Sequence, residues 1–298
     1  MGRTGVTAAR TTIVVATRNR SAELARTLSR LRALRPTPPV IVLDNASTDR
    51  TAERVAEFPG VQLVRLRRNA GAAARNIGVR LASTPYAAFS DDDSWWAPDA
   101  LPRAESLLAA YPRLGLLAAR TLVGPAALPD PTNELMASSP LGREPDLPGP
   151  SVLGFLACST VVRASAFLEA GGFSSLLHFG AEETLLSYDM AALGWGLCYV
   201  DDVCAHHHPS TARSSAAGRR RREQRNNTMI AWMRRPAGVA LGATTRLMRS
   251  VPGDPGAALA LLDAVPRMPL ALRARTPLPA RLEANIRRLE QTENKEPT

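Results

Sequence analysis

Three consecutive aspartates, Asp91, Asp92 and Asp93, follow an apolar run that ends at Phe89. Because side chains alternate at the end of a strand, Asp91 and Asp93 should project to one side of the turn. Two carboxylates so placed can hold Mg²⁺ or Mn²⁺ against a substrate diphosphate, since these hard cations prefer oxygen ligands. The triplet therefore indicates a nucleotide-sugar site, although an acidic run alone is more often a solvated turn or a helix N-cap than a metal site.

Other polar residues stand at the ends of further apolar runs. Thr17 and Arg18 follow TTIVVA, and Asp44 and Asn45 follow VIVL. A carboxylate there can accept a hydrogen bond from a base N–H or a ribose hydroxyl. The small-residue segment RNAGAAARNIG carries Arg75, whose planar guanidinium suits a phosphate or base near a helix N-terminus. The structural alternatives are simple polar turns and an alanine-rich helix packed on a sheet.

Strands and helices are expected to alternate through the first third of the chain. Strands are predicted at 11–17, 40–43, 61–66 and 86–89. Helices are predicted at 21–34, 49–57, 71–82 and 98–110. Such apolar strands separated by helices predict an α/β, Rossmann-like fold with a mostly parallel sheet covered on both faces. Ligands of such sheets bind at the C-terminal ends of the strands, where the candidate residues lie.

The middle of the chain is less regular. Residues 124–150 contain seven prolines, which predicts a long loop of the kind that forms lids or binding segments. The sheet should resume at 155–162, with a short helix at 165–170. An amphipathic helix is expected at 181–193, and a strand at 195–204 should run into three histidines.

Charge is strongly segregated along the chain. Residues 1–208 contain 20 basic and 20 acidic residues, whereas residues 209–298 contain 17 basic and 7 acidic ones. The net charge of +10 therefore lies in the tail. We expect 211–298 to be an Arg-rich helical extension that either meets an anionic surface or presents a solvated helical face.

The same tail contains a candidate membrane-binding helix. Arg219–Arg222 precede Met229, Trp232 and Met233, which would share one side of a helix. The alternative is that these apolar residues pack on the catalytic domain. The cysteines, Cys158, Cys198 and Cys204, lack metal or disulfide spacing, and no apolar stretch approaches about 18 residues. We therefore expect a cytoplasmic protein, either soluble or peripheral on the inner face of the plasma membrane.

Six segments together resemble the family 2 glycosyltransferases. They are VVATRNR, VLDNASTDRT, RNAGAAARNIG, FSDDDSWWAPDAL, FGAEETLLSYDMAALGW and YVDDVCAHHH. The resemblance covers about residues 11–210 and implies a glycosyltransferase A-type fold within a catalytic domain at 1–210. That fold would have a nucleotide-binding half at about 11–97 and an acceptor half at about 98–210. It also implies an inverting, metal-dependent transfer from a UDP-, GDP- or dTDP-linked sugar.

The resemblance assigns roles to the candidate residues. Asp91 and Asp93 look like the aspartates that hold Mn²⁺ or Mg²⁺ and the donor diphosphate, while Asp92 occupies the variable middle position. Thr17, Asp44 and Arg75 look like nucleoside contacts. The residues expected at the donor are Thr17, Arg18, Asp44, Asn45, Arg75, Asp91 and Asp92.

An acidic pair, Glu182 and Glu183, resembles the Glu-Asp motif of the family, in which the second residue is the general base. Glu183 stands where Asp is common, so its carboxylate sits about one methylene further from the backbone. An inverting transfer needs one carboxylate opposite the leaving group to take the acceptor proton. The structural alternative is a favourable acidic first turn of a helix. A further departure is Asp189, where relatives often carry Arg.

Three adjacent histidines allow several interpretations. Strand alternation places His206 and His208 on one face and His207 on the other. We predict that His206 lies on the metal side, and a zinc site is not favoured because the cysteines supply no ligand pattern. Trp95 and Trp96 are candidates for stacking on a sugar or lipid acceptor, or for core packing.

Two other classes of protein share part of this pattern. A sugar-nucleotide nucleotidyltransferase would carry a Gly-rich loop after its first strand, and VVATRNR contains no glycine. A nonenzymatic membrane- or nucleic-acid-binding module would explain the Arg-rich tail but not Asp44, the aspartates or Glu183. Nucleic acid is therefore not the expected partner. The acceptor class stays open among glycans and lipid-linked, cell-envelope or small secondary-metabolite molecules, and the sequence does not predict the oligomeric state.

Overall fold

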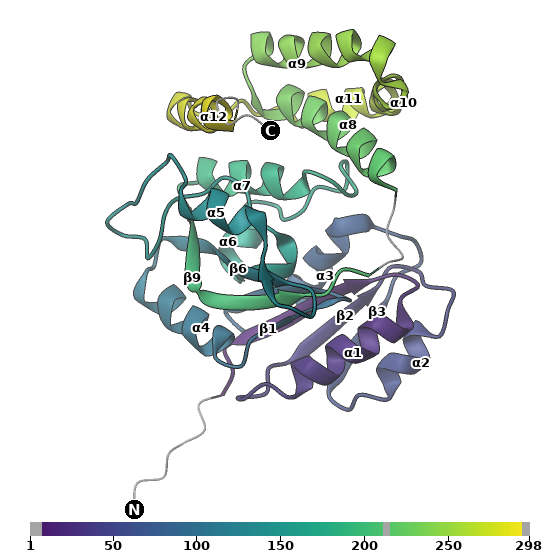
Figure 1. The fold of residues 1–298 in the computed structure, drawn as a ribbon, viewed down its shortest axis with the longest axis vertical. Coiled ribbons are helices and arrows are strands. Elements are labelled where there is room, and N and C mark those ends of the chain that lie inside the picture. Colours follow the sequence, from purple (N-terminus) through teal and green to yellow (C-terminus); the bar gives the residue numbers. More distant parts are fainter. Residues whose placement is uncertain (1–7, 211–214, 294–298) are drawn as a thin grey trace, which may run out of the picture.

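A curled sheet of nine strands forms the centre of the computed structural model, which describes residues 8–210 and 215–293 (Figure 1). The strands run in the order β3-β2-β1-β4-β8-β6-β9-β5, with β7 paired to β6. The first four are β1 (Thr11–Thr17), β2 (Val40–Asp44), β3 (Val61–Arg65) and β4 (Tyr86–Asp91). They pair in parallel, as predicted, so their C-terminal ends form one rim.

Helices cover both faces of this sheet because the apolar strand residues alternate between two cores. Ile13 and Val15 face one core, which α1 (Ser21–Arg32), α2 (Thr51–Ala56) and α4 (Ala100–Ala110) complete. Val14 faces the other core, completed by α3 (Ala74–Leu81), α6 (Ala164–Glu169) and α7 (Glu182–Ala192). The mixed α/β architecture predicted from the sequence is therefore confirmed.

A glycine lets α3 approach the sheet closely. A Cβ atom on Gly78 would lie 2.4 Å from Cγ1 of Val14, so no larger residue fits there. The short 3₁₀ turn η1 (Gly71–Ala73) leads into this helix. The small residues noted in the sequence thus bring α3, and with it Arg75, against the strand ends.

The second half of the sheet was only partly predicted. It contains β5 (Ser94–Trp96), β6 (Leu114–Val123), β7 (Leu128–Pro129), β8 (Thr160–Arg163) and β9 (Gly196–His207), with the 3₁₀ turn η2 (Ala157–Ser159) before β8. β6 is a central strand that the sequence interpretation left out. It pairs in parallel with β9 and antiparallel with β8.

The proline-rich stretch is also more ordered than a plain loop. It contains α5 (Pro131–Ala137), whose first turn is capped when the backbone N–H of Thr132 donates to Asp130 at 2.9 Å. Pro131 is tolerated because the first residue of a helix needs no N–H donor. The predicted long loop over 124–150 is therefore interrupted by β7 and α5, which the sequence did not indicate.

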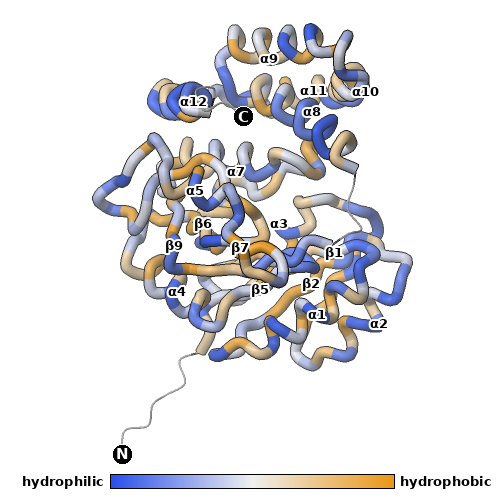
Figure 2. Tube along the Cα trace, viewed as in Figure 1, coloured by the Kyte–Doolittle hydropathy of each residue, from blue (hydrophilic) through white to orange (hydrophobic). Residues whose placement is uncertain are grey.

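Five helices follow β9 in the described residues, and α7 lies between them and the sheet (Figure 1). They are α8 (Ala216–Arg234), α9 (Ala237–Ser250), α10 (Pro255–Ala264), α11 (Met268–Arg273) and α12 (Ala280–Glu293), with 3₁₀ turns η3 (Val251–Gly253) and η4 (Val265–Arg267). The N-terminal part of α8 is strongly hydrophilic (Figure 2). None of the helices in the described ranges is long and apolar enough to cross a membrane.

The apolar side of α8 packs inward. Met229 and Met233 are buried in a core that includes Leu177 and Leu185 of the preceding region. The alternative prediction, that this patch packs on the body, is therefore confirmed for Met229 and Met233, and a membrane-facing position of both methionines was wrong, because burial already removes them from water. Charge pairs reinforce this contact, since Arg234 of α8 forms an ion pair with Asp189 of α7. That pairing gives a physical reason for the acidic residue at 189.

Candidate active site

A hydrogen bond to Asp92, the middle aspartate of the triplet, connects the C-terminal ends of β1 and β4. The hydroxyl of Thr17 donates to Oδ2 of Asp92 at 2.9 Å, and Nη1 of Arg20 lies 3.3 Å from Oδ1. Burial raises the pKa of Asp92 to about 7, with Arg20 opposing the shift and Asp91 and Asp93 adding to it. The Thr17 and Asp92 side chains are thus directed at each other inside the rim.

Asp91 and Asp93, the neighbours of Asp92 in the chain, have other partners. The side chain of Asp91 is 34% exposed and forms an ion pair with Arg75. Asp93 is buried, and its carboxylate accepts from the backbone N–H of Ser210 at 2.9 Å. Its Oδ1 also lies 3.3 Å from Nε2 of His207. The end of β9 therefore closes over the triplet.

A metal-sized cluster forms at this place. Ligand atoms of Asp91, Cys158 and His207 all lie within 4.8 Å of one another, and Asp93 adjoins His207. Burial raises the pKa of the Cys158 thiol well above its usual range, which disfavours a thiolate at this position when no cation is bound. Carboxylate oxygens then dominate the donor set, which fits Mn²⁺ or Mg²⁺ better than a thiophilic ion.

The structure places His207, and not His206, beside the aspartates. The His206 ring stacks on Trp95 with centroids 5.7 Å apart, and His208 lies 4.5 Å from the same ring. His207 faces the aspartates instead, because β9 pairs with β5 so that Trp95 lies opposite His206. The predicted alternation is confirmed, but the placement of His206 on the metal side was wrong. Trp96 is a buried core residue.

The other predicted donor residues differ in their burial and in their hydrogen bonds. Asp44 is buried, and its Oδ1 accepts from the backbone N–H of Ser47 at 2.8 Å. Asn45 bridges to the next loop, since its Oδ1 accepts from the Ala70 N–H at 3.0 Å. Arg18 is exposed. Asp44 therefore stands at the end of β2, and Asn45 acts on the loop before α3.

Arg75 connects the aspartates to the acidic pair on α7. It is 5% exposed, and its Nε has no hydrogen-bond partner among the described residues. Its positive charge opposes the pKa rises of both Glu182 and Glu183, while Asp91 contributes to those rises. The aspartates, Arg75 and the acidic pair therefore belong to one electrostatic site.

Glu182 and Glu183 form the first turn of α7. Burial first, and then the neighbouring Glu182, raises the pKa of Glu183 to about 8. Glu182 is buried, its pKa is also raised by burial, and its Oε2 has no hydrogen-bond partner in the described part of the chain. Two adjacent carboxyls in this setting resist ionising together, and a poised pKa suits a general base.

The loop before this pair is held by α8, which the sequence interpretation did not include in the site. His178, Gly180 and Ala181 all have positive φ, at 65°, 90° and 59°. The buried Asn226 amide donates to the carbonyls of Leu177 and Phe179 at 3.0 Å each, and also to that of Gly180. Local motifs carry no signal for such a contact, because it joins residues far apart in sequence.

Asn226→Ala should therefore destabilise the protein and loosen the acidic turn. Removing one amide leaves buried carbonyls without a donor, which typically costs about 1–3 kcal/mol. Chemical denaturation should show this loss, whereas Asn227→Ala at the neighbouring exposed position should shift stability by less than about 0.5 kcal/mol. Equal effects of the two substitutions would contradict a clamping role for Asn226.

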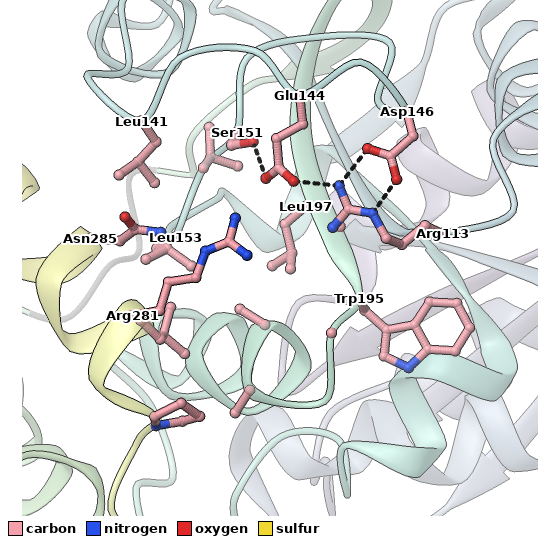
Figure 3. Close-up of a pocket in the computed structure, with 17 residues that line it drawn as sticks. Arg113, Leu141, Glu144, Asp146, Ser151, Leu153, Trp195, Leu197, Arg281 and Asn285 are labelled. Carbon is pink, nitrogen blue, oxygen red and sulfur yellow. Dashed lines mark hydrogen bonds and ion pairs between the residues drawn. The ribbon is translucent and has the colours of Figure 1, made fainter.

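A cavity away from the rim has a different character. It has a volume of about 510 Å³ and lies at the C-terminal end of α7, beside Ala192 and Trp195. Figure 3 shows Arg113 held between Glu144 and Asp146, with Arg281 pointing in from α12. Because α7 rises about 1.5 Å per residue, this cavity is more than about 10 Å from the acidic first turn. It does not belong to the site at the rim.

Comparisons with known proteins agree with this arrangement. The pre-mycofactocin glycosyltransferase of Mycobacterium tuberculosis is 31% identical over 187 residues. That match covers 58% of this chain but 37% of the relative, so the chain spans little more than a third of that protein.

Solved structures share the fold at low identity. The mannosyltransferase PcManGT from Pyrobaculum calidifontis, in complex with GDP-Man and Mn²⁺, matches with a TM-score of 0.60 at 19% identity, covering 98% of this chain and 77% of that one. S. aureus TarS 1-349 in complex with UDP-GlcNAc matches with a TM-score of 0.56 at 16% identity, covering 74% and 66%. Both are glycosyltransferases with the A-type fold. The model of the family described as Glycosyl transferase family 2 matches residues 12–169, more than half of the chain. This chain therefore belongs to glycosyl transferase family 2.

Proposed function

We propose that the protein is an inverting, metal-dependent glycosyltransferase that moves a sugar from a nucleoside-diphosphate donor to an acceptor hydroxyl. The observation that carries this proposal is the single site formed by Asp91, Arg75 and Glu183, in which the charges of the first two act on the third. A donor-side cation cluster and a poised carboxylate are the two parts that such a transfer requires.

In the proposed reaction, Glu183 takes the proton of the acceptor hydroxyl as its oxygen attacks the anomeric carbon. The new C–O bond forms on the face opposite the leaving group, and the bond to the diphosphate breaks with its electron pair on the departing oxygen. Asp91, Asp93 and His207 would hold Mn²⁺ or Mg²⁺, which when bound neutralises charge on the diphosphate. Arg75 positions Asp91 through their ion pair.

The remaining rim residues would select the nucleoside. Asp44 is the strongest candidate for a base or ribose contact, because its buried carboxylate stands at the strand end. Arg18 is exposed nearby, whereas Thr17 and Asn45 support the rim through their own hydrogen bonds. We further propose that residues 1–210 form the catalytic domain and that 211–298 form its helical extension.

A donor screen tests the proposal. The protein should be stabilised against thermal unfolding by one of the UDP-, GDP- or dTDP-sugars, and more strongly with Mn²⁺ than without it. A ligand that binds only the folded state raises the melting temperature by mass action. Absence of stabilisation by every donor at millimolar concentration would count against the proposed function.

Membrane association stays a proposal, with a different surface from the one expected. Large apolar side chains are exposed on α9–α11, among them Leu262 at 67% and Val265 at 68%. Arg249 and Arg273 are exposed on the same helices. Exposed apolar side chains together with arginines suit the interface of an anionic bilayer, so we propose that helices α9–α11 dock on such a membrane.

Vesicle co-sedimentation checks this surface. The protein should pellet with vesicles of phosphatidylcholine and phosphatidylglycerol at low salt, and less so at high salt, because charge attraction is screened. Replacing Leu262 and Val265 by Ser should reduce pelleting severalfold, whereas Leu128→Ser, at an exposed site on β7, should not. A protein that stays in the supernatant at low salt would contradict membrane docking.

A further inference from the structure

A large cleft lies between the body and the C-terminal helices, beside the core in which α8 packs on the body. Its volume is about 1000 Å³, twice that of the cavity in Figure 3. Its walls come from α5, α7, α8, α9 and α12 together with the segment at 152–155. Elements distant in sequence therefore build one concave surface, which is where small-molecule sites usually occur.

The cleft reaches the first turn of α7, the helix that carries the proposed base. Thr184, the residue after Glu183, lines it, and so does Tyr188 one turn further along α7. On the other wall Phe155 lines the cleft three residues before Cys158, which belongs to the cation cluster. A molecule in the cleft could thus present a group to the first turn of α7 while most of it lay between α7 and α9.

The lining combines apolar side chains with a buried polar group. Apolar side chains include Met136, Leu153, Phe155, Ile230 and Leu247. Gln224 adds an unsatisfied polar group, because its buried Oε1 has no hydrogen-bond partner among the described residues. Such a surface favours a ligand with a substantial apolar part and at least one hydrogen-bond donor.

We infer that this cleft is the acceptor site, and that the acceptor is an amphipathic molecule. Its hydroxyl end would lie at Thr184 beside Glu183, and its apolar part would extend along α8 and α9. This inference rests on the proposed function, since it names the class of molecule that receives the sugar. The helical extension then has a definite role, because it supplies most of the apolar wall.

Two acceptor probes of different length test the inference. Octyl and methyl β-D-glucoside carry the same hydroxyls, but only the octyl compound has a chain that can fill the cleft. With the donor found in the thermal screen, the wild-type protein should use octyl glucoside with a kcat/KM at least about tenfold higher, since each buried methylene adds favourable free energy. The probes are kept below the micellar concentration.

A pair of variants on one helix sharpens the test. Ala243 lines the cleft, whereas Leu241, two residues earlier, is 56% exposed. Ala243→Trp should abolish the preference for the octyl compound and its thermal stabilisation of the protein, whereas thermal stabilisation by the donor, which binds at the rim, should remain. Leu241→Trp should behave like the wild type in all three measurements.

The outcomes separate the two proposals. Octyl-glucoside stabilisation that is lost in Ala243→Trp, together with no turnover of any donor, would support the cleft as an amphiphile site and overturn the proposed function. Intact donor hydrolysis with equal use of both glucosides, or a preference that survives Ala243→Trp, would overturn the cleft assignment.

Discussion

Glu183→Gln should lower turnover by about two to four orders of magnitude while leaving donor affinity within about twofold. Because its pKa is raised to about 8, Glu183 is largely protonated at pH 7, and glutamine resembles that neutral form in size and polarity. Donor binding should therefore survive the substitution. The proton acceptor is lost, however, so steady-state transfer should fail while isothermal titration still detects the donor.

The pH dependence provides an internal check on this assignment. A raised pKa means that the carboxylate form of Glu183 grows as pH rises through about 8, so wild-type kcat should increase from pH 6 towards that value. Glu183→Asp keeps a carboxylate and should retain more activity than Glu183→Gln. A loss of less than tenfold in Glu183→Gln would move the base to Glu182 or elsewhere.

The second large effect is expected at the cation cluster. Asp93→Asn should remove the Mn²⁺-dependent part of the stabilisation by UDP or GDP, because an amide oxygen binds a divalent cation far more weakly than a carboxylate does. Thermal unfolding with the nucleotide, with and without Mn²⁺, measures this directly. Melting without ligand shows whether the fold survives, since Asp93 also accepts from Ser210.

Asp92→Asn is the matched comparison one residue away. The pKa of Asp92 is already raised to about 7 by burial, and Thr17 can still donate to an amide oxygen at the same position. This variant should keep Mn²⁺-dependent stabilisation. If it loses as much as Asp93→Asn does, or if Asp93→Asn loses nothing, the cation is held differently.

The first half of the fold was predictable because its strands are apolar and α1 carries leucines at a helical spacing, Leu24, Leu28 and Leu31. β6 was missed for a physical reason. Its sequence, LGLLAARTLV, mixes leucine with small residues, and such a run is compatible with a helix or a buried strand until its neighbours are known. Its central place is set by pairing with β8 and β9, which lie far along the chain.

The motifs of the site could be predicted from the sequence, but the direction in which their side chains point could not. Alternation correctly separated His207 from its neighbours, yet it did not say which face meets the aspartates. That choice is made by β5, a strand of three residues that places Trp95 opposite His206. Similarly, the apolar side of α8 was compatible with burial in the protein or in a membrane, and only the tertiary structure shows that Met229 packs in a core that includes Leu185.

Release of nucleoside diphosphate from a panel of UDP-, GDP- and dTDP-sugars is the most direct measurement of the central claim. We expect one donor to release its diphosphate with Mn²⁺ present, release to stop when the metal is chelated, and Asp93→Asn and Glu183→Gln to be nearly inactive. No release from any donor, or release that is indifferent to the metal and to both substitutions, would contradict the assignment of this site to sugar transfer.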